Sequence, residues 1–239
     1  MTKSYSMQKN LVVVQCRYSS TRLFGKALYP ICGIPMLVFL LKRLKDSLSS
    51  DDYNVILATT ENKEDDIIDA WGKECDTNVI RGEDKDVLKR FIRCLNRYPS
   101  DFVVRVTADN PLTCPEILKE CVSEIRRSKS DYLLSENHPV GTGVDVFTFK
   151  LLKEMEQENL SQYEREHINA YVLKYPTRFK IKSLRMRGII GRPDLSVTVD
   201  TEQNWKRVNS IFKPYEKEAW RISIVETISR MDSAINPTD

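Results

Sequence analysis

Residues 11–28 read Leu-Val-Val-Val-Gln-Cys-Arg-Tyr-Ser-Ser-Thr-Arg-Leu-Phe-Gly-Lys-Ala-Leu. The first four residues are apolar, and a short apolar run bounded by polar residues predicts a buried strand. The following loop holds cations, hydroxyl groups and a glycine: Arg17, Ser19, Ser20, Thr21, Arg22, Gly25 and Lys26. Hydroxyls and backbone N–H groups donate to phosphate oxygens, and cations neutralise them. The stretch therefore predicts a phosphate-binding loop after a strand, although the pattern alone fits a solvated basic loop equally well.

The rest of the first half alternates between strand and helix patterns. Apolar runs predict strands at 53–58, 77–80, 102–106 and 131–134, and helical periodicity separates them at 36–48, around 67–71, at 86–97 and from Pro115 onward. This alternation predicts an α/β, Rossmann-like fold, in which helices cover both faces of a mostly parallel sheet.

The second half is less regular. Short strands are predicted at 144–147, 179–184 and 196–199, and helices at about 148–158, 162–174 and 217–231. The sequence contains no obvious linker. We therefore expect one domain over 1–239, with a small inserted lobe at about 135–190.

Several polar residues follow predicted strands. They are Arg81 with Gly82, and Asp109, in addition to the 17–26 loop. Ligands of such sheets bind outside the carboxyl ends of the strands, so these groups are expected on one rim. Two neighbouring aspartates have local alternatives: Asp86 is a plausible helix N-cap, and Asp109 precedes Asn110-Pro111 as a turn former would.

Composition narrows the class of protein. The chain has 239 residues, of which 41% are hydrophobic and 30% charged, and a net charge of +3. Neither nucleic acid nor a membrane is indicated as a partner. The amino-terminal residues are polar without an apolar signal region, so we expect a cytoplasmic protein. The six cysteines form no Cys-x-x-Cys motif, which favours free thiols over a zinc site or disulfides.

Ordered motifs along most of the chain resemble one family. Residues 15–26 are similar to the opening signature of the cytidylyltransferases that make CMP-activated sugar acids, in which Ala- or Cys-Arg precedes Ser-Thr-Arg-Leu-Pro-Gly-Lys. Further likenesses lie at 81–88, 105–112, 143–147 (with one residue missing or slipped), 164–168 and 199–201. Within the family the chain most resembles the spore coat polysaccharide biosynthesis protein F branch. Phe24 replaces the usual proline and Ala108 the usual glycine.

The resemblance implies a GT-A-type nucleotidyltransferase that uses CTP and Mg²⁺. It implies that Lys26, Arg22 and Asp109 are catalytic, and that Asp109 and Asp200 hold the metal. The nucleotide-binding residues that it implies are Gln15, Arg17, Ser19, Ser20, Thr21, Gly25, Arg81, Gly82 and Asp86.

The acceptor would be a small sugar-type molecule, a sugar acid or a related sugar or polyol phosphate, used in surface polysaccharide biosynthesis. The residues implied for it are Asp145, Arg165 and His167. A surface ion pair and a structural histidine are the alternatives for Arg165 and His167, and a helix N-cap is the alternative for Asp200. The resemblance further implies a homodimer.

Two other functions compete with this interpretation. A glycosyltransferase of the same fold needs an Asp-x-Asp motif at a strand end, and Asp84-Lys85-Asp86 spells that motif at a predicted helix start. A non-catalytic homologue is the second alternative, and the retained Arg22, Lys26, Asp109 and Asp200 argue against it.

Overall fold

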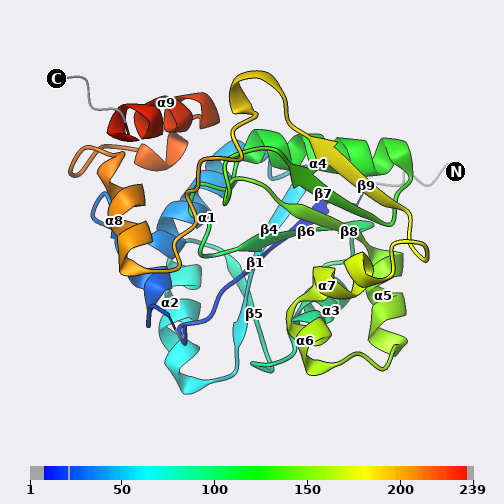
Figure 1. Cartoon of the computed structure of the whole chain (residues 1–239). Helices are drawn as coiled ribbons and strands as arrows, with labels where there is room; N and C mark the ends of the chain where they lie inside the picture. Colours follow the sequence, from blue (N-terminus) through cyan, green and yellow to red (C-terminus); the bar gives the residue numbers. More distant parts are fainter. Residues whose placement is uncertain (1–7, 21, 236–239) are drawn as a thin grey trace, which may run out of the picture.

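A seven-stranded sheet forms the centre of the molecule (Figure 1). The structure is a computed structural model that describes residues 8–20 and 22–235. The strands lie in the order β5 (Asn78–Gly82), β4 (Tyr53–Thr60), β1 (Asn10–Gln15), β6 (Phe102–Thr107), β8 (Asp145–Thr148), β7 (Tyr132–Glu136) and β9 (Ile181–Arg185). Only β8 runs antiparallel to its neighbours. The predicted α/β fold with a mostly parallel sheet is confirmed.

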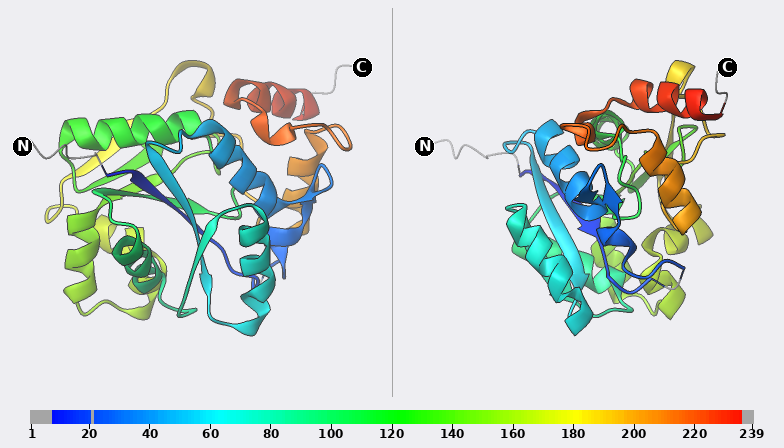
Figure 2. Two further views of the ribbon diagram at one scale, coloured as in Figure 1. Left: turned by 180° about the vertical axis from the view of Figure 1, so that it is seen from behind. Right: turned by 90° about the vertical axis from the view of Figure 1, so that its left-hand side faces the viewer.

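Helices cover both faces of this sheet, as Figure 2 shows from two further sides. Strand β1 is buried on both faces because its residues alternate between two cores. The core that contains Val12 and Val14 packs under α1 (Met36–Ser47), α2 (Asp66–Glu74), α4 (Pro115–Ser128), α8 (Glu202–Ser210) and α9 (Ile224–Ile235). The core that contains Leu11 and Val13 packs under α3 (Val87–Arg97), α5 (Phe149–Gln157) and α7 (Ile168–Lys174), with α6 (Gln162–Glu166) beside it.

Smaller elements complete the chain. A two-stranded hairpin pairs β2 (Pro30–Ile31) with β3 (Ile34–Pro35), and 3₁₀ turns form η1 (Lys26–Leu28), η2 (Lys63–Asp65), η3 (Gly188–Ile190) and η4 (Ala219–Arg221). Within residues 8–20 and 22–235, no helix has the length and apolar character needed to cross a membrane.

Three predicted elements of the second half differ from the structure. Residues 196–199 make one isolated bridge, between Val140 and Ser196, in place of a strand. The helix predicted at 162–174 is divided at His167, whose φ of −106° and ψ of 75° are not helical. The last helix begins at Ile224, because a left-handed residue at Glu218 and the η4 turn precede it.

The region at about 135–190 contributes β8 and β9 to the central sheet and α5–α7 to one face. It is therefore continuous with the sheet along one side. Its assignment as a lobe that binds the acceptor and pairs two copies stays a prediction.

Arg43 joins three parts of the chain from inside the fold. Its side chain is buried, and its Nε donates to the Thr113 carbonyl at 2.8 Å. Its Nη1 donates to the carbonyls of Trp220 and Ile222 at 2.7 and 2.6 Å. Buried carbonyls that lose a charged donor become unpaired, which is costly.

We expect Arg43→Met to lower the free energy of unfolding by about 3 kcal/mol, because a buried charged donor shared by three carbonyls is removed. Chemical denaturation followed by circular dichroism measures the change. Arg207→Met, at an exposed position on α8, is the control and should change stability by less than about 0.5 kcal/mol. Equal stability of the two variants would contradict the role given to Arg43.

Candidate functional site

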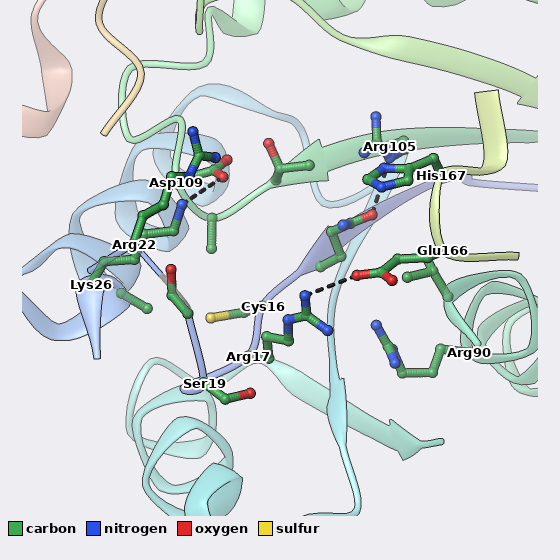
Figure 3. Close-up of a pocket in the computed structure, with 16 residues that line it drawn as sticks. Cys16, Arg17, Ser19, Arg22, Lys26, Arg90, Arg105, Asp109, Glu166 and His167 are labelled. Carbon is green, nitrogen blue, oxygen red and sulfur yellow. Dashed lines mark hydrogen bonds and ion pairs between the residues drawn. The ribbon is translucent and has the colours of Figure 1, made fainter. Parts of the chain in front are cut away.

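A cavity of about 260 Å³ opens at the carboxyl ends of β1 and β6 (Figure 3). It is lined by Gln15, Cys16, Arg17, Ser19, Ser20, Arg22, Lys26, Ala27, Val87, Arg90, Arg105, Thr107, Ala108, Asp109, Glu166 and His167. This is the rim on which the sequence places its cationic loop.

Lys26 joins two aspartates at one end of the cavity. Its Nζ lies 2.9 Å from Asp109 Oδ2 and 2.9 Å from Asp200 Oδ1. Arg22 Nη2 lies 2.8 Å from the same Asp200 oxygen. The two aspartates are neighbours because the segments that carry them are hydrogen-bonded, with Val199 N donating to the Asp109 carbonyl at 2.8 Å. Lys26, Asp109 and Asp200, which are far apart in sequence, thus form one cluster.

The chemistry of this cluster suits a hard divalent cation. Two carboxylates that reach one ammonium can also face one ion, and both supply oxygen, the ligand that Mg²⁺ prefers. The described residues hold no group of three or more His, Cys, Asp or Glu that could bind a metal. Protein ligation here would therefore come from two carboxylates, as is usual for Mg²⁺ that shares its shell with water and phosphate.

The loop that carries the cations is held in a defined shape. Gly25 has a φ of +68°, and a Cβ at this position would lie 3.1 Å from the ring of Tyr18. Asp65, which is buried, accepts hydrogen bonds from the backbone N–H groups of Tyr18 at 2.6 Å and Thr60 at 3.1 Å. Ser19 and Ser20 then face the cavity, whereas Thr21 lies outside the described residues.

Carboxylates also hold Arg17 in the middle of the cavity. Its Nη1 lies 3.2 Å from Asp84 Oδ1, and its Nη2 lies 2.9 Å from Glu166 Oε1. Glu166 ends α6, and the next residue, His167, lines the same cavity. The helix break at His167 therefore lies directly beside the site.

Asp86 and Arg165, which come from two of the sequence motifs, form an ion pair with each other. Asp86 is the N-cap of α3, as predicted, and accepts from Lys89 N at 2.8 Å. Its second oxygen lies 3.0 Å from Arg165 Nη1. Neither Asp86 nor Arg165 is among the residues that line the cavity.

Arg81 is directed along the edge of the sheet. Its Nε donates to the Thr60 carbonyl at 2.7 Å, and its Nη1 lies 2.6 Å from Asp66 Oδ1. Gly82 packs against Arg90, and a Cβ at Gly82 would lie 2.7 Å from Arg90 Cγ. Neither Arg81 nor Gly82 lines the cavity, but Gly82 allows Arg90 to do so.

A second hollow, of about 360 Å³, adjoins the first and shares Arg105 and Thr107 with it. Arg105 donates to Gln15 Oε1 at 3.0 Å and to Asp145 Oδ2 at 3.0 Å. The buried Tyr132 hydroxyl donates to the other Asp145 oxygen at 2.8 Å. Asp145 lines this second hollow and holds Arg105 between the two spaces.

Sequence reasoning did not single out five residues that shape the cavity: Asp65, Arg90, Arg105, Thr107 and Glu166. Arg105 and Thr107 lie in the motif that ends at Asp109, and Glu166 adjoins His167, so those motifs carried a usable signal. No local pattern marks Asp65 or Arg90, because only tertiary packing brings them to the loop.

The Cys16 thiol lines the cavity but is poorly suited to nucleophilic chemistry. Burial raises the pKa of Cys16, and the nearby Asp65 and Asp109 carboxylates raise it further. The thiolate is the reactive form of cysteine, so the thiol stays protonated and inert at neutral pH.

Comparisons with known proteins agree with this geometry. A sequence model of the family described as Cytidylyltransferase matches residues 11–218. An uncharacterised protein of Methanocaldococcus jannaschii is 34% identical over 87% of this chain and 85% of its own length. Spore coat polysaccharide biosynthesis protein SpsF of Bacillus subtilis is 28% identical over 87% of this chain and 88% of its own length. The 3-deoxy-manno-octulosonate cytidylyltransferase of Alteromonas mediterranea is 24% identical over 62% of this chain and 58% of its own length.

Solved structures share the fold. A cytidylyltransferase from Leptospira borgpetersenii superposes with a TM-score of 0.85 and 28% identity, covering 97% of this chain and 95% of that one. A CMP:2-keto-3-deoxy-manno-octonic acid synthetase, solved in complex with CTP, superposes with a TM-score of 0.63 over 85% and 98%. At 15% identity, the second likeness is one of fold.

We expect iodoacetamide at about pH 8 to alkylate Cys16 at least about tenfold more slowly than the partly exposed Cys32, because burial keeps the Cys16 thiol protonated. Mass spectrometry of timed digests measures both rates. In denaturant the two rates should become similar, which is the control. Rapid labelling of Cys16 in the folded protein would show that its thiol is activated.

Proposed function

Because the chain belongs to the cytidylyltransferase family, we propose that it transfers CMP from CTP to a sugar acid or a related sugar or polyol phosphate, releasing pyrophosphate. Family membership makes the chain a CTP-dependent nucleotidyltransferase. The names of two relatives, one acting on 3-deoxy-manno-octulosonate and one in spore coat polysaccharide biosynthesis, support the acceptor class and a role in surface polysaccharides.

The observation that carries the proposal is the contact of Lys26 with both Asp109 and Asp200. Nucleotidyl transfer brings an anionic acceptor to an anionic triphosphate, so charge neutralisation and positioning should supply most of the catalysis. The cluster offers both: cations for phosphate oxygens and carboxylates for a metal.

The chain's own cations would bind the triphosphate. Lys26 is a compact point charge that can follow negative charge as it develops on the α-phosphate, and Arg22 is placed beside it. Arg17 can bind a further phosphate oxygen once it leaves its two carboxylate partners. The Ser19 and Ser20 hydroxyls, which line the same cavity, are available as donors.

Asp109 and Asp200 would hold the metal, for which Mg²⁺ fits the oxygen-only ligand set. When bound, such an ion neutralises phosphate charge and orients the triphosphate. In the structure the ammonium of Lys26 bridges the two carboxylates. We therefore infer that Lys26 moves from the aspartates to the phosphate when nucleotide and metal enter.

The acceptor is proposed to bind across the second hollow, where Asp145 and Arg105 lie. His167, at the break between α6 and α7, lines the first cavity and could accept the proton of the attacking hydroxyl. Arg165 forms an ion pair with Asp86 at the N-terminus of α3. Its proposed contact with the acceptor therefore requires this ion pair to break.

The glycosyltransferase alternative has less support. Its Asp-x-Asp carboxylates would be Asp84 and Asp86, yet Asp84 pairs with Arg17, and Asp86 caps α3 and pairs with Arg165. The paired carboxylates that share one cation are Asp109 and Asp200 instead.

The proposed reaction is tested by pyrophosphate release. The protein is incubated with CTP, Mg²⁺ and a panel of sugar acids and sugar or polyol phosphates, and pyrophosphate is measured with a coupled assay. Release with at least one acceptor supports the proposal. Release with none, together with sugar transfer from a nucleotide sugar, would favour the glycosyltransferase. The expected homodimer and cytoplasmic location stay predictions, the first testable by light scattering.

We expect Lys26→Ala to lower the rate of CTP turnover by about 10²–10³-fold, because a charge that stabilises the developing phosphate charge is lost. Steady-state pyrophosphate release measures the effect. Lys73→Ala, at an exposed position on α2, is the control and should keep the wild-type rate. Turnover at the wild-type level in Lys26→Ala would remove Lys26 from the phosphate site.

We expect Asp109→Asn to lower turnover by at least about 10²-fold and to raise the Mg²⁺ concentration needed for half-maximal activity, because a charged metal ligand is lost. A Mg²⁺ titration at saturating CTP measures both. Stability should change little, since the amide still fits the turn. Asp51→Asn, in an exposed turn, is the matched control. An unchanged Mg²⁺ requirement would contradict Asp109 as a ligand.

A further inference from the structure

The far end of the cavity holds a buried cation that the described residues leave incompletely paired. The Arg90 side chain is 2% exposed and lines the cavity. Its Nη1 donates to two backbone carbonyls, those of Glu83 and Asp84 (2.8 Å to the latter). Its Nε is buried without a hydrogen-bond partner. Among the residues that the structure describes, no carboxylate lies within 4.0 Å of this guanidinium.

A buried guanidinium with an unpaired N–H lowers the stability of a folded chain. An unsatisfied buried donor costs about 1–3 kcal/mol, and a buried charge costs more unless it is paired. Arg17, a like charge, lies close to Arg90, and burial lowers the Arg90 pKa. The buried Arg43 shows the alternative, because its Nε is satisfied by a carbonyl. In the described ranges, the buried side-chain nitrogen and oxygen atoms without a hydrogen-bond partner are Arg90 Nε and the Thr59 hydroxyl, and of these only Arg90 belongs to a residue that lines the cavity.

The backbone is shaped to bring Arg90 to the cavity. Gly82, at the end of β5, has no side chain where a Cβ would lie 2.7 Å from Arg90 Cγ. The two carbonyls that bind Nη1 belong to the loop directly after Gly82. These contacts fix the plane of the guanidinium, and no residue that the structure describes accepts a hydrogen bond from its other edge, Nε with Nη2.

We propose that the Nε–Nη2 edge of Arg90 binds the O2 and N3 acceptors of the cytosine base and so selects CTP over UTP. Two parallel N–H donors of arginine match two adjacent acceptors of a base. Cytosine presents O2 and N3 as such a pair, whereas uracil carries a hydrogen on N3. This inference rests on the proposed function, since it places the nucleotide in the same cavity.

The position in the cavity favours the base over a phosphate. Lys26, Arg22 and Asp109 lie at the opposite end, as Figure 3 shows, and Asp200 contacts Lys26 and Arg22 there, so that end suits the triphosphate. Val87, from the same helix as Arg90, is buried and lines the cavity. An apolar side chain beside a donor edge suits the face and the edge of a planar ring.

The assignment also gives the 81–82 motif a different use. Arg81 is bonded to the Thr60 carbonyl and to Asp66, and it is not one of the residues that line the cavity. Of the nucleotide contacts that the family resemblance implies around Arg81 and Gly82, the one with the base is therefore assigned to Arg90, for which Gly82 leaves room. Arg81 would instead support the loop that holds Arg90.

The test is calorimetric binding of CTP and UTP, with Mg²⁺ and without acceptor, to the wild type, Arg90→Lys and Arg90→Met. The wild type should bind CTP at least about tenfold more tightly than UTP, as expected for one bidentate pair. Both variants should reduce this ratio to about threefold or less, mainly by weakening CTP. Arg97→Met, at an exposed position on α3, is the control and should keep the ratio.

A third ligand tests which edge of the base is bound. The triphosphate of 2-pyrimidinone riboside keeps O2 and N3 but lacks the amino group of cytosine. Arg90→Lys should weaken this ligand and CTP by the same factor. A loss confined to CTP would show that Arg90 acts on the amino side and would overturn the assignment.

Other outcomes separate this inference from the proposed function. A wild-type preference for CTP that survives in correctly folded Arg90→Lys and Arg90→Met, or no preference at all, overturns the role of Arg90 even if pyrophosphate is released. Conversely, a preference that disappears in both variants supports Arg90 even if no tested acceptor releases pyrophosphate. Circular dichroism and thermal melting establish that the variants are folded, and Arg90→Lys retains the charge if Arg90→Met does not fold.

Discussion

The contact of one ammonium with two carboxylates connects the distant parts of this chain. Lys26 comes from the loop after the first strand, Asp109 from the turn after β6, and Asp200 from the segment before α8. Each lies at the carboxyl side of the sheet, where parallel strands deliver their loops to a common edge. Without Lys26, two carboxylates would face each other across a small space, and their repulsion would separate the segments that carry them.

Ion pairs of the same kind extend from Lys26 to the middle of the cavity. Arg22 pairs with Asp200, and Arg17 pairs with Asp84 and Glu166. These cations of the site are therefore paired with carboxylates of the same chain. In the proposed function, an anionic nucleotide entering with a divalent cation would exchange these partners, because the cations would gain phosphate oxygens and the carboxylates would gain the metal.

Sequence predicted the sheet, its parallel character and the rim where the cationic loop meets Asp109, because those features depend on local hydrophobic patterns and on a general rule of topology. It did not predict the break at His167 or the loss of a strand at 196–199. Within 196–199, Val197 and Val199 are buried in the core as the residues of a strand would be. The segment nevertheless forms one isolated bridge and no continuous ladder of β-sheet hydrogen bonds. The direction of Arg81 depends on its bonds to Thr60 and Asp66, and that of Arg90 on packing against Gly82, and no pattern of residue types encodes either contact.

The absence of a ladder at 196–199 has a consequence for ion selectivity. Asp109 follows a strand paired on both sides, whereas Asp200 ends a segment attached by the Val140–Ser196 bridge and by the bond from Val199 N to the Asp109 carbonyl. If Asp109 and Asp200 hold the metal as proposed, the weaker backbone attachment of the Asp200 segment would let the pair adapt to ionic radius, so we expect activation by Mn²⁺ as well as by Mg²⁺. A strict requirement for one of these ions would indicate that both carboxylates are rigid.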